Sequence, residues 1–285
     1  MLVHFKEILQ AKVDEHRALG SFNAFNLETA KAIVKAAKDS GLPLAVQTTE
    51  NALQYAGLKN LYTLIKIVIE SESGVVPVSI HLDHGKNLEI IEACLKIGYT
   101  SVHCDASAFS FEENIGITKE AAEMAHEHGA LVQGELGNIL GKEGLIKIRQ
   151  GLNFKKLLTP PEQIAEYVER TGVDTVAVSL GNLHGHFVGD ENLDFERLAA
   201  IHEYIKIPMV LHGGSGIPGE QIRKAISLGV RIINIDTDLR LVFLQAIKQN
   251  LSMEKDKVDP REPLTQGMMA MTEVVKTKAK LFNLN

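Results

Sequence analysis

The chain contains few of the features that mark several common protein classes. Its only cysteines are Cys94 and Cys104, each within an apolar stretch, and it has no CxxC pair. Two thiols in such surroundings are typical of buried, reduced side chains, and they argue against a disulfide framework.

Long apolar runs, a targeting pattern and an excess of positive charge are also missing. No run approaches the ~20 apolar residues of a membrane span, and the N-terminal MLVHFKEILQ has neither a basic region nor a small-residue cleavage site. The net charge is −6, with no block of Lys and Arg to hold a phosphate backbone. We therefore expect a cytoplasmic protein that binds neither a membrane nor nucleic acid.

The chain shows no linker, no low-complexity segment and no GxGxxG turn after its first apolar run, but it does show a regular alternation of two patterns. Segments with helical periodicity separate eight short apolar runs: SFNAFN, PLAVQTT, VPVSIHLDHG, SVHCDAS, LVQGELG, TVAVSLGNLHG, PMVLHGGSG and RIINIDTD. Strand and helix alternating eight times predict one (β/α)8 TIM barrel over residues 1–285. A doubly wound open sheet is the alternative, although that fold more often carries a GxGxxG turn after its first strand. The long connection at about 138–160 predicts a mobile active-site loop.

Most of the unusual polar residues fall at the carboxyl ends of these runs, where the strands of a parallel barrel converge on one face. Three histidines there, His84, His184 and His212, are each followed by glycine. Together they favour a three-histidine metal site with an open position. Any one of them alone would read as a strand-end histidine bonded to a loop. Strict alternation would send Asp83 and His84 to opposite faces, so at least one must lie past the regular strand.

A glycine-rich turn lies between the seventh run and the following helix, in VLHGGSGIPGEQIRKA. Its backbone N–H groups and the helix N-terminus would suit an anion, and barrels often hold phosphate in the loops after strands seven and eight. Thr237 in NIDTD would supply the second wall of that site.

The ordered set of motifs resembles the class II, metal-dependent ketose-bisphosphate aldolases, which include the fructose-bisphosphate and tagatose-bisphosphate aldolases of carbohydrate metabolism and glycolysis. The matching segments are FNAFNLE, HLDHG, DAS, GELG, GNLHG, VLHGGSGIP, NIDT and VDPREPL. They extend over almost the whole chain.

The resemblance implies roles for particular residues. His84, His184 and His212 would bind a catalytic Zn2+, and Asp83 would be the acid/base at the aldehyde oxygen. Glu143, in GKEG, would exchange the carbon-bound proton. Asp105 and Glu135 match positions that either bind a second, buried metal or order the histidines. Substrate and phosphate contacts would come from Asn23, Thr49, Gly185, Gly213, Gly214, Ser215, Asn234, Ile235, Asp236 and Thr237.

The resemblance further implies a zinc-dependent lyase that reversibly cleaves a ketose bisphosphate to dihydroxyacetone phosphate and an aldehyde such as glyceraldehyde 3-phosphate. A monovalent cation, Na+ or K+, would lie on backbone carbonyls near Gly185 and Gly213. Relatives are usually homodimers or homotetramers. The alternatives are an aldolase for another phosphorylated ketose and a non-catalytic sugar-phosphate-binding subunit. Retention of Asp83, Glu143 and the three histidines argues against the latter, and the absence of an HxH pair on strand one argues against a metal-dependent hydrolase.

The sequence departs from the family pattern at a few positions. His103 stands where relatives usually carry an apolar residue, and it shares strand parity with Asp105. It could be an additional metal ligand, a hydrogen-bond partner of a ligand, or simply a packed histidine. The residues after Glu143 and the triplet Thr48, Thr49 and Glu50 also differ from the common pattern, and the triplet is expected to face the aldehyde half of the substrate.

Overall fold

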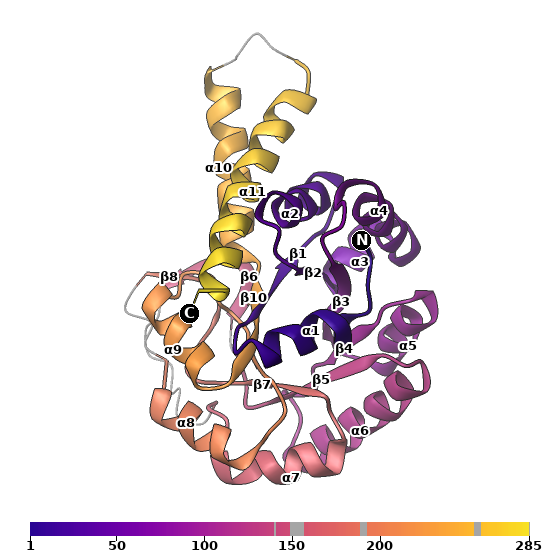
Figure 1. Cartoon of the computed structure of the whole chain (residues 1–285), viewed down its shortest axis with the longest axis vertical. Helices are drawn as coiled ribbons and strands as arrows, with labels where there is room; N and C mark the ends of the chain where they lie inside the picture. The colour runs from indigo at the N-terminus through magenta and orange to yellow at the C-terminus, as the bar shows by residue number, and fades with distance from the viewer. Residues whose placement is uncertain (140, 149–156, 189–192, 254–257, 285) are drawn as a thin grey trace.

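A closed barrel of parallel strands forms the centre of the molecule (Figure 1). The computed structural model describes residues 1–139, 141–148, 157–188, 193–253 and 258–284, without the side chains of 141–148 and 186–188. The barrel strands are β1 (Leu19–Asn23), β2 (Leu44–Thr49), β3 (Val78–Gly85), β4 (Ser101–Cys104), β5 (Leu131–Leu136), β7 (Thr175–Val178), β9 (Met209–Leu211) and β10 (Val230–Ile235). Strand β1 pairs with β10 as well as with β2, which closes the barrel and excludes the open sheet. The predicted TIM barrel is confirmed.

Helices surround the barrel and follow its strands. They are α1 (Phe5–Asp14), α2 (Leu27–Ser40), α3 (Glu50–Ala56), α4 (Leu58–Glu72), α5 (Leu88–Ile97), α6 (Phe111–Glu127), α7 (Pro161–Thr171), α8 (Phe195–Tyr204), α9 (Gly219–Ser227), α10 (Thr237–Met253) and α11 (Arg261–Phe282). Local signals fix their ends: the side chain of Asn26 caps α2 at its start, and Gly41 ends it with a φ of 68°. Within the described ranges, no helix combines the length and apolarity needed to cross a membrane.

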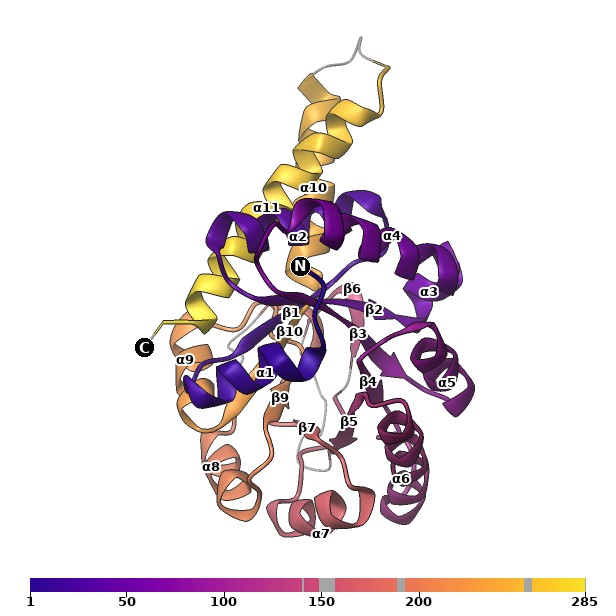
Figure 2. The same cartoon turned by 45° about the vertical axis from the view of Figure 1, so that its right-hand side comes forward.

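The first helix, α1, covers the amino-terminal opening of the barrel (Figure 2). Its apolar residues Phe5, Ile8 and Leu9 pack against Leu19 of β1 and Val210 of β9. The chain before α1 is tied to the start of β3 by the Val3 N–H, which donates to the Val78 carbonyl. Apolar packing therefore fills this end, and the polar strand ends collect at the other.

A second, two-stranded sheet lies outside the barrel and was not expected from the sequence. In it, β6 (Gly141–Ile148) pairs in parallel with β8 (His184–Val188). The sequence had placed His184 at the end of the sixth barrel strand, but that strand, β7, stops at Val178 and His184 opens β8. The long connection at 138–160 thus contains β6. Residues 140 and 149–156 of the predicted mobile loop lie outside the described residues.

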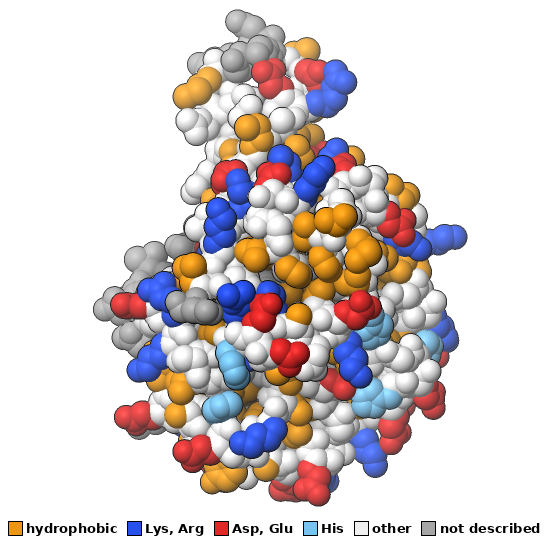
Figure 3. Space-filling model, viewed as in Figure 1, with side chains coloured by type: hydrophobic (Ala, Val, Ile, Leu, Met, Phe, Trp, Pro, Cys, Tyr) orange, Lys and Arg blue, Asp and Glu red, His pale blue; other side chains and the backbone are white. Residues whose placement is uncertain are grey.

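Helices α10 and α11 form a hairpin that projects from the barrel (Figure 1). At its base α11 packs on the barrel wall, where Phe282 stacks on Phe22 of β1 with ring centroids 6.5 Å apart. On the face in Figure 3, Lys and Arg side chains alternate with Asp and Glu, and the described residues form no continuous basic patch there.

Candidate active site

An irregular end of β3 aims two adjacent side chains into the mouth of the barrel. The register between β3 and β4 shifts between Leu82 and Gly85, and His84 has a φ of 52°. This left-handed conformation is uncommon for a residue other than glycine. It breaks the strand alternation, so Asp83 and His84 both approach His212, which directly follows β9. The unusual conformation is that of His84 itself and not of the glycine that follows it, Gly85.

Three imidazole rings, two from barrel strand ends and one from the start of β8, converge at this point. His84 Nε2 and His212 Nδ1 lie 3.1 Å apart. The ring of His184 is 4.7 Å from that of His84 and 5.8 Å from that of His212, centroid to centroid. Two nitrogens bound to one tetrahedral zinc ion at the usual distance would be about 3.3 Å apart. The spacing of His84 and His212 is therefore suited to a shared cation.

The donor set fits a metal ion by its chemistry as well. Among the described residues, Asp83, His84, His103 and His212 have ligand-capable atoms within 4.8 Å of one another, and so do His84, His103, Asp105 and Glu135. His184 belongs to neither group. Its Nε2, however, is buried and has no hydrogen-bond partner in the described part of the chain. A buried nitrogen without a partner is costly unless something binds it.

Carboxylates around His84 control its charge. Burial opposes protonation, but Asp83 and Asp105 outweigh it and raise the pKa of His84 to about 10. Burial also opposes ionisation of Asp105. Its Oδ2, however, lies 2.8 Å from His84 Nδ1, and this hydrogen bond outweighs burial and lowers the pKa of Asp105. Burial and then the Asp105 charge raise the pKa of Glu135 to about 8. Asp105 thus fixes the His84 ring with Nε2 facing His212.

The other histidines of the cluster stay neutral. Burial, followed by the positive charge of His84, lowers the pKa of His184 to about 3 and that of His212 well below its usual value. The same two causes lower the pKa of His103. Neutral imidazoles are the form that binds metal ions, so a cation bound here would displace a proton from His84 and find the other rings already neutral.

Three side-chain amides hold Asp83, which is fully buried. Asn23 Nδ2 and Gln47 Nε2 donate to its Oδ2 at 3.2 and 3.0 Å, and Asn234 Nδ2 donates to its Oδ1 at 3.1 Å. Burial raises the pKa of Asp83, and the charge of His84 opposes that rise. The carboxyl is therefore positioned rigidly beside the imidazoles, 3.8 Å from His84 Nε2.

Sequence reasoning did not single out Gln47 or Gln133. Gln47 is buried on β2 and bonds both Asp83 and Asn23. Gln133 is buried on β5 with its side-chain nitrogen 2.7 Å from His212 Nε2. A glutamine within an apolar strand is itself a signal, because burying an amide requires a partner.

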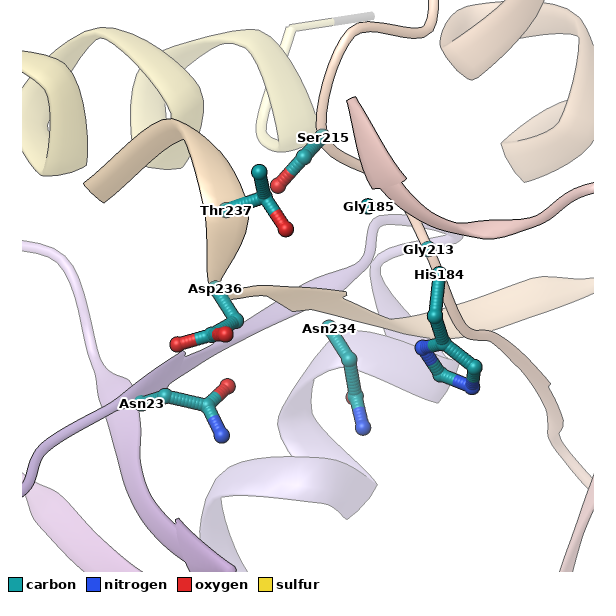
Figure 4. A pocket seen from close by; sticks show the side chains of 8 residues that line it. All are labelled: Asn23, His184, Gly185, Gly213, Ser215, Asn234, Asp236 and Thr237. Carbon is teal, nitrogen blue, oxygen red and sulfur yellow. The ribbon is translucent and has the colours of Figure 1, made fainter. Parts of the chain in front are cut away.

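A small cavity lies beside the histidines (Figure 4). It is lined by Asn23, His184, Gly185, Gly213, Ser215, Asn234, Asp236 and Thr237. Gly213 has a φ of 63°, and a Cβ atom there would lie 2.2 Å from the Leu183 carbonyl oxygen, so the close approach of these two loops requires glycine. Seven of these residues are among the ten predicted substrate contacts, and the eighth is His184.

The other three predicted contacts are not among the residues that line this cavity. Thr49 caps α3, Ile235 is buried in the core, and the N–H of Gly214 donates to the Asn234 carbonyl. The helix whose start lines the cavity is α10, at Thr237, whereas α9 begins at Gly219, outside the lining. A helix N-terminus favours an anion there. Glu143 lies on β6, where the structure describes the backbone only.

Comparison with known proteins gives consistent results over the whole chain. A family model described as fructose-bisphosphate aldolase class-II matches residues 3–285. The fructose-bisphosphate aldolase of Geobacillus stearothermophilus is 38% identical over 282 residues, which cover 99% of this chain and 96% of that protein. The fructose-bisphosphate aldolase of Staphylococcus aureus strain N315 is 36% identical over 284 residues, covering 99% and 97%. The crystal structure of the YdjI aldolase from Escherichia coli K12 aligns with a TM-score of 0.83 at 32% identity, covering 99% of this chain and 97% of that one.

Proposed function

This chain belongs to the class II fructose-bisphosphate aldolase family, whose members are metal-dependent ketose-bisphosphate aldolases. On that basis we propose that it reversibly cleaves fructose 1,6-bisphosphate or tagatose 1,6-bisphosphate. The products would be dihydroxyacetone phosphate and glyceraldehyde 3-phosphate. The observation that carries this proposal is the approach of His84 and His212 to within 3.1 Å beside the buried Asp83.

His84, His184 and His212 are the proposed ligands of Zn2+. A bound zinc ion would act as a Lewis acid toward the negative charge that develops at the ketone oxygen during cleavage. Asp105 is proposed to hold the ring of His84 in place, since its carboxylate lies 2.8 Å from Nδ1. Glu135 is the second carboxyl of the same ligand-capable group. We also propose a monovalent cation, Na+ or K+, on carbonyls near Gly185 and Gly213, and a homodimer or homotetramer as the assembly.

Asp83 is the proposed proton carrier at the aldehyde end. When the bond between C3 and C4 breaks, the C4 hydroxyl becomes a carbonyl and its proton passes to the Asp83 carboxylate. The three amides around Asp83 keep this acceptor in place before the proton arrives. In the direction of synthesis the same carboxyl returns the proton.

The cavity beside the histidines is the proposed site of the dihydroxyacetone phosphate end. The backbone turn at Gly213 and Ser215 and the start of α10 at Thr237 line one side of it. Binding a phosphate there would fix the reacting carbons next to Asp83 and the histidines. Asn234 Oδ1, which is buried and unpartnered among the described residues, is available to a substrate hydroxyl.

A panel of sugar phosphates tests the proposed substrate. With Zn2+ present, release of dihydroxyacetone phosphate should be at least ~10-fold more efficient, as kcat/KM, from one of the two bisphosphates than from fructose 1-phosphate, because a built polar site discriminates against a missing group. Preference for a monophosphate would indicate that the substrate is another phosphorylated ketose. Binding without release from any compound would indicate the non-catalytic alternative.

Glu143 is the proposed base for the carbon-bound proton. Asp83 serves the aldehyde end, so a second carboxyl must act at C3, and Glu143 lies between glycines in GKEG. Glu143→Ala should still bind dihydroxyacetone phosphate but exchange its carbon-bound proton with deuterated solvent at least ~100-fold more slowly, as followed by NMR. The matched control is Glu203→Ala, an exposed glutamate on α8. Exchange at the wild-type rate in Glu143→Ala would remove Glu143 from the mechanism.

A further inference from the structure

His103 is a fourth buried imidazole in the cluster, and the proposed mechanism does not use it. It is fully buried on β4. Its ring centroid lies 4.8 Å from that of His84 and 4.9 Å from that of His212. A buried polar ring requires partners for its nitrogens, and the two nitrogens of His103 have different neighbours.

The first nitrogen, Nδ1, accepts a hydrogen bond from the backbone N–H of His84 at 3.2 Å. This N–H lies within the shifted register between Leu82 and Gly85, at the residue with a φ of 52°. A side chain on the neighbouring strand therefore satisfies a partly buried donor of the irregular segment. The bond connects His103 directly to the conformation that brings Asp83 and His84 to the same side.

The second nitrogen, Nε2, faces Glu135. It lies 3.6 Å from Glu135 Oε2, and neither atom has a hydrogen-bond partner among the described residues. A neutral imidazole carries one proton, so a ring that accepts at Nδ1 carries it on Nε2. Nε2 then has no lone pair to offer a metal ion, and its N–H points toward the Glu135 carboxyl across a distance slightly longer than a hydrogen bond.

We propose that His103 is a positioning residue for His84 and not an additional metal ligand. Its Nδ1 holds the His84 backbone N–H, which keeps the left-handed turn at the end of β3 and directs the His84 ring toward His212. Its Nε2–H completes the polar contact with Glu135. This inference rests on the proposed role of His84 in binding Zn2+.

Two substitutions separate the functions of the two ring nitrogens. Asparagine places an amide oxygen near the position of Nδ1, and glutamine places an amide nitrogen near that of Nε2. The dissociation constant for Zn2+ is measured by competition with a chromogenic chelator. His103→Gln and His103→Leu, which lose the acceptor for the His84 N–H, should bind Zn2+ about 10- to 100-fold more weakly. His103→Asn, which keeps the acceptor, should recover most of that loss.

Two control variants show which hypothesis a given result tests. His81→Asn alters another buried histidine, which lies on β3, bonds Ser101 Oγ at 2.9 Å and is outside both ligand-capable groups, so its Zn2+ affinity should match the wild type. His84→Ala should lose tight binding. If it does not, the proposed metal site is wrong. If His84→Ala loses Zn2+ while His103→Gln does not, the site stands and this inference is wrong. Equal losses in His103→Asn and His103→Gln would also overturn it.

The proton position is measurable without any variant. In the zinc-loaded protein labelled with 15N-histidine, long-range 1H–15N correlation spectra distinguish the two tautomers and a metal-bound nitrogen. We expect the His103 proton on Nε2. A proton on Nδ1 would remove the acceptor for the His84 N–H, and a metal-bound Nε2 would make His103 a ligand, so either result would overturn the proposal.

Discussion

Asp83→Ala should lower the rate of cleavage by about three to four orders of magnitude while the protein keeps its Zn2+. Asp83 is assigned the proton of the C4 hydroxyl, and no other described carboxyl is bonded by the three amides of Asn23, Gln47 and Asn234. Removing it leaves the C4 hydroxyl without a proton acceptor when the bond between C3 and C4 breaks. The proposed zinc ligands are unchanged. Turnover is measured with the preferred bisphosphate, and the metal content of the purified variant is measured separately.

The matched control for Asp83→Ala is Asp174→Ala. Asp174 is a half-buried aspartate next to β7, and its Oδ2 accepts from the Val132 N–H at 2.8 Å near the amino-terminal end of the barrel. Its loss should affect stability but leave turnover close to wild type. Loss of Zn2+ together with activity in Asp83→Ala would instead make Asp83 a metal ligand, which its inclusion in a ligand-capable group allows.

Chelation should abolish cleavage and leave the barrel folded. The proposed ligands His84 and His212 lie at or just past barrel strands held by an apolar core, and His212 follows directly after β9, whose residues are all buried. A site positioned by the core does not need the ion to form. Without the ion, the charge at the ketone oxygen loses its Lewis acid. Activity should fall to background, and the circular dichroism spectrum should stay native.

Restoring Zn2+ to the chelated protein should return the activity and serves as the control for damage by the chelator. Global unfolding on chelation would mark the metal as structural. Persistent cleavage by a fully metal-free sample would contradict the proposed mechanism as a whole.

The alternation of strands and helices was predictable from the sequence because each element is encoded by its own residues. Strands buried on both faces are short, mostly apolar runs, as in TVAV of β7, and helices carry caps such as Asn26 and Gly41. The eight barrel strands and their closure follow from this order. The HG repeats and the glycine-rich turn likewise located His84, His212 and the cavity at Gly213.

Pairing between distant segments was not predictable in the same way. The parallel pair of β6 and β8 joins residues about forty positions apart, and hydrophobic periodicity within either segment carries no signal of its partner. For this reason His184 was assigned to the end of a barrel strand, whereas β7 stops at Val178. The backbone of Glu143 lies on β6, and its role stays a prediction.

The sequence by itself determined the barrel, its polar end and the residue types available for chemistry. Tertiary structure alone decided how those residues face one another. Strand alternation would separate Asp83 from His84, and only the register shift against β4 brings both to His212. Gln47 and His103 acquire their partners, Asp83 and the His84 N–H, through neighbouring strands. The physical reason is that a local pattern fixes which residues form a strand, whereas register and bulges arise from packing between strands that are distant in the chain.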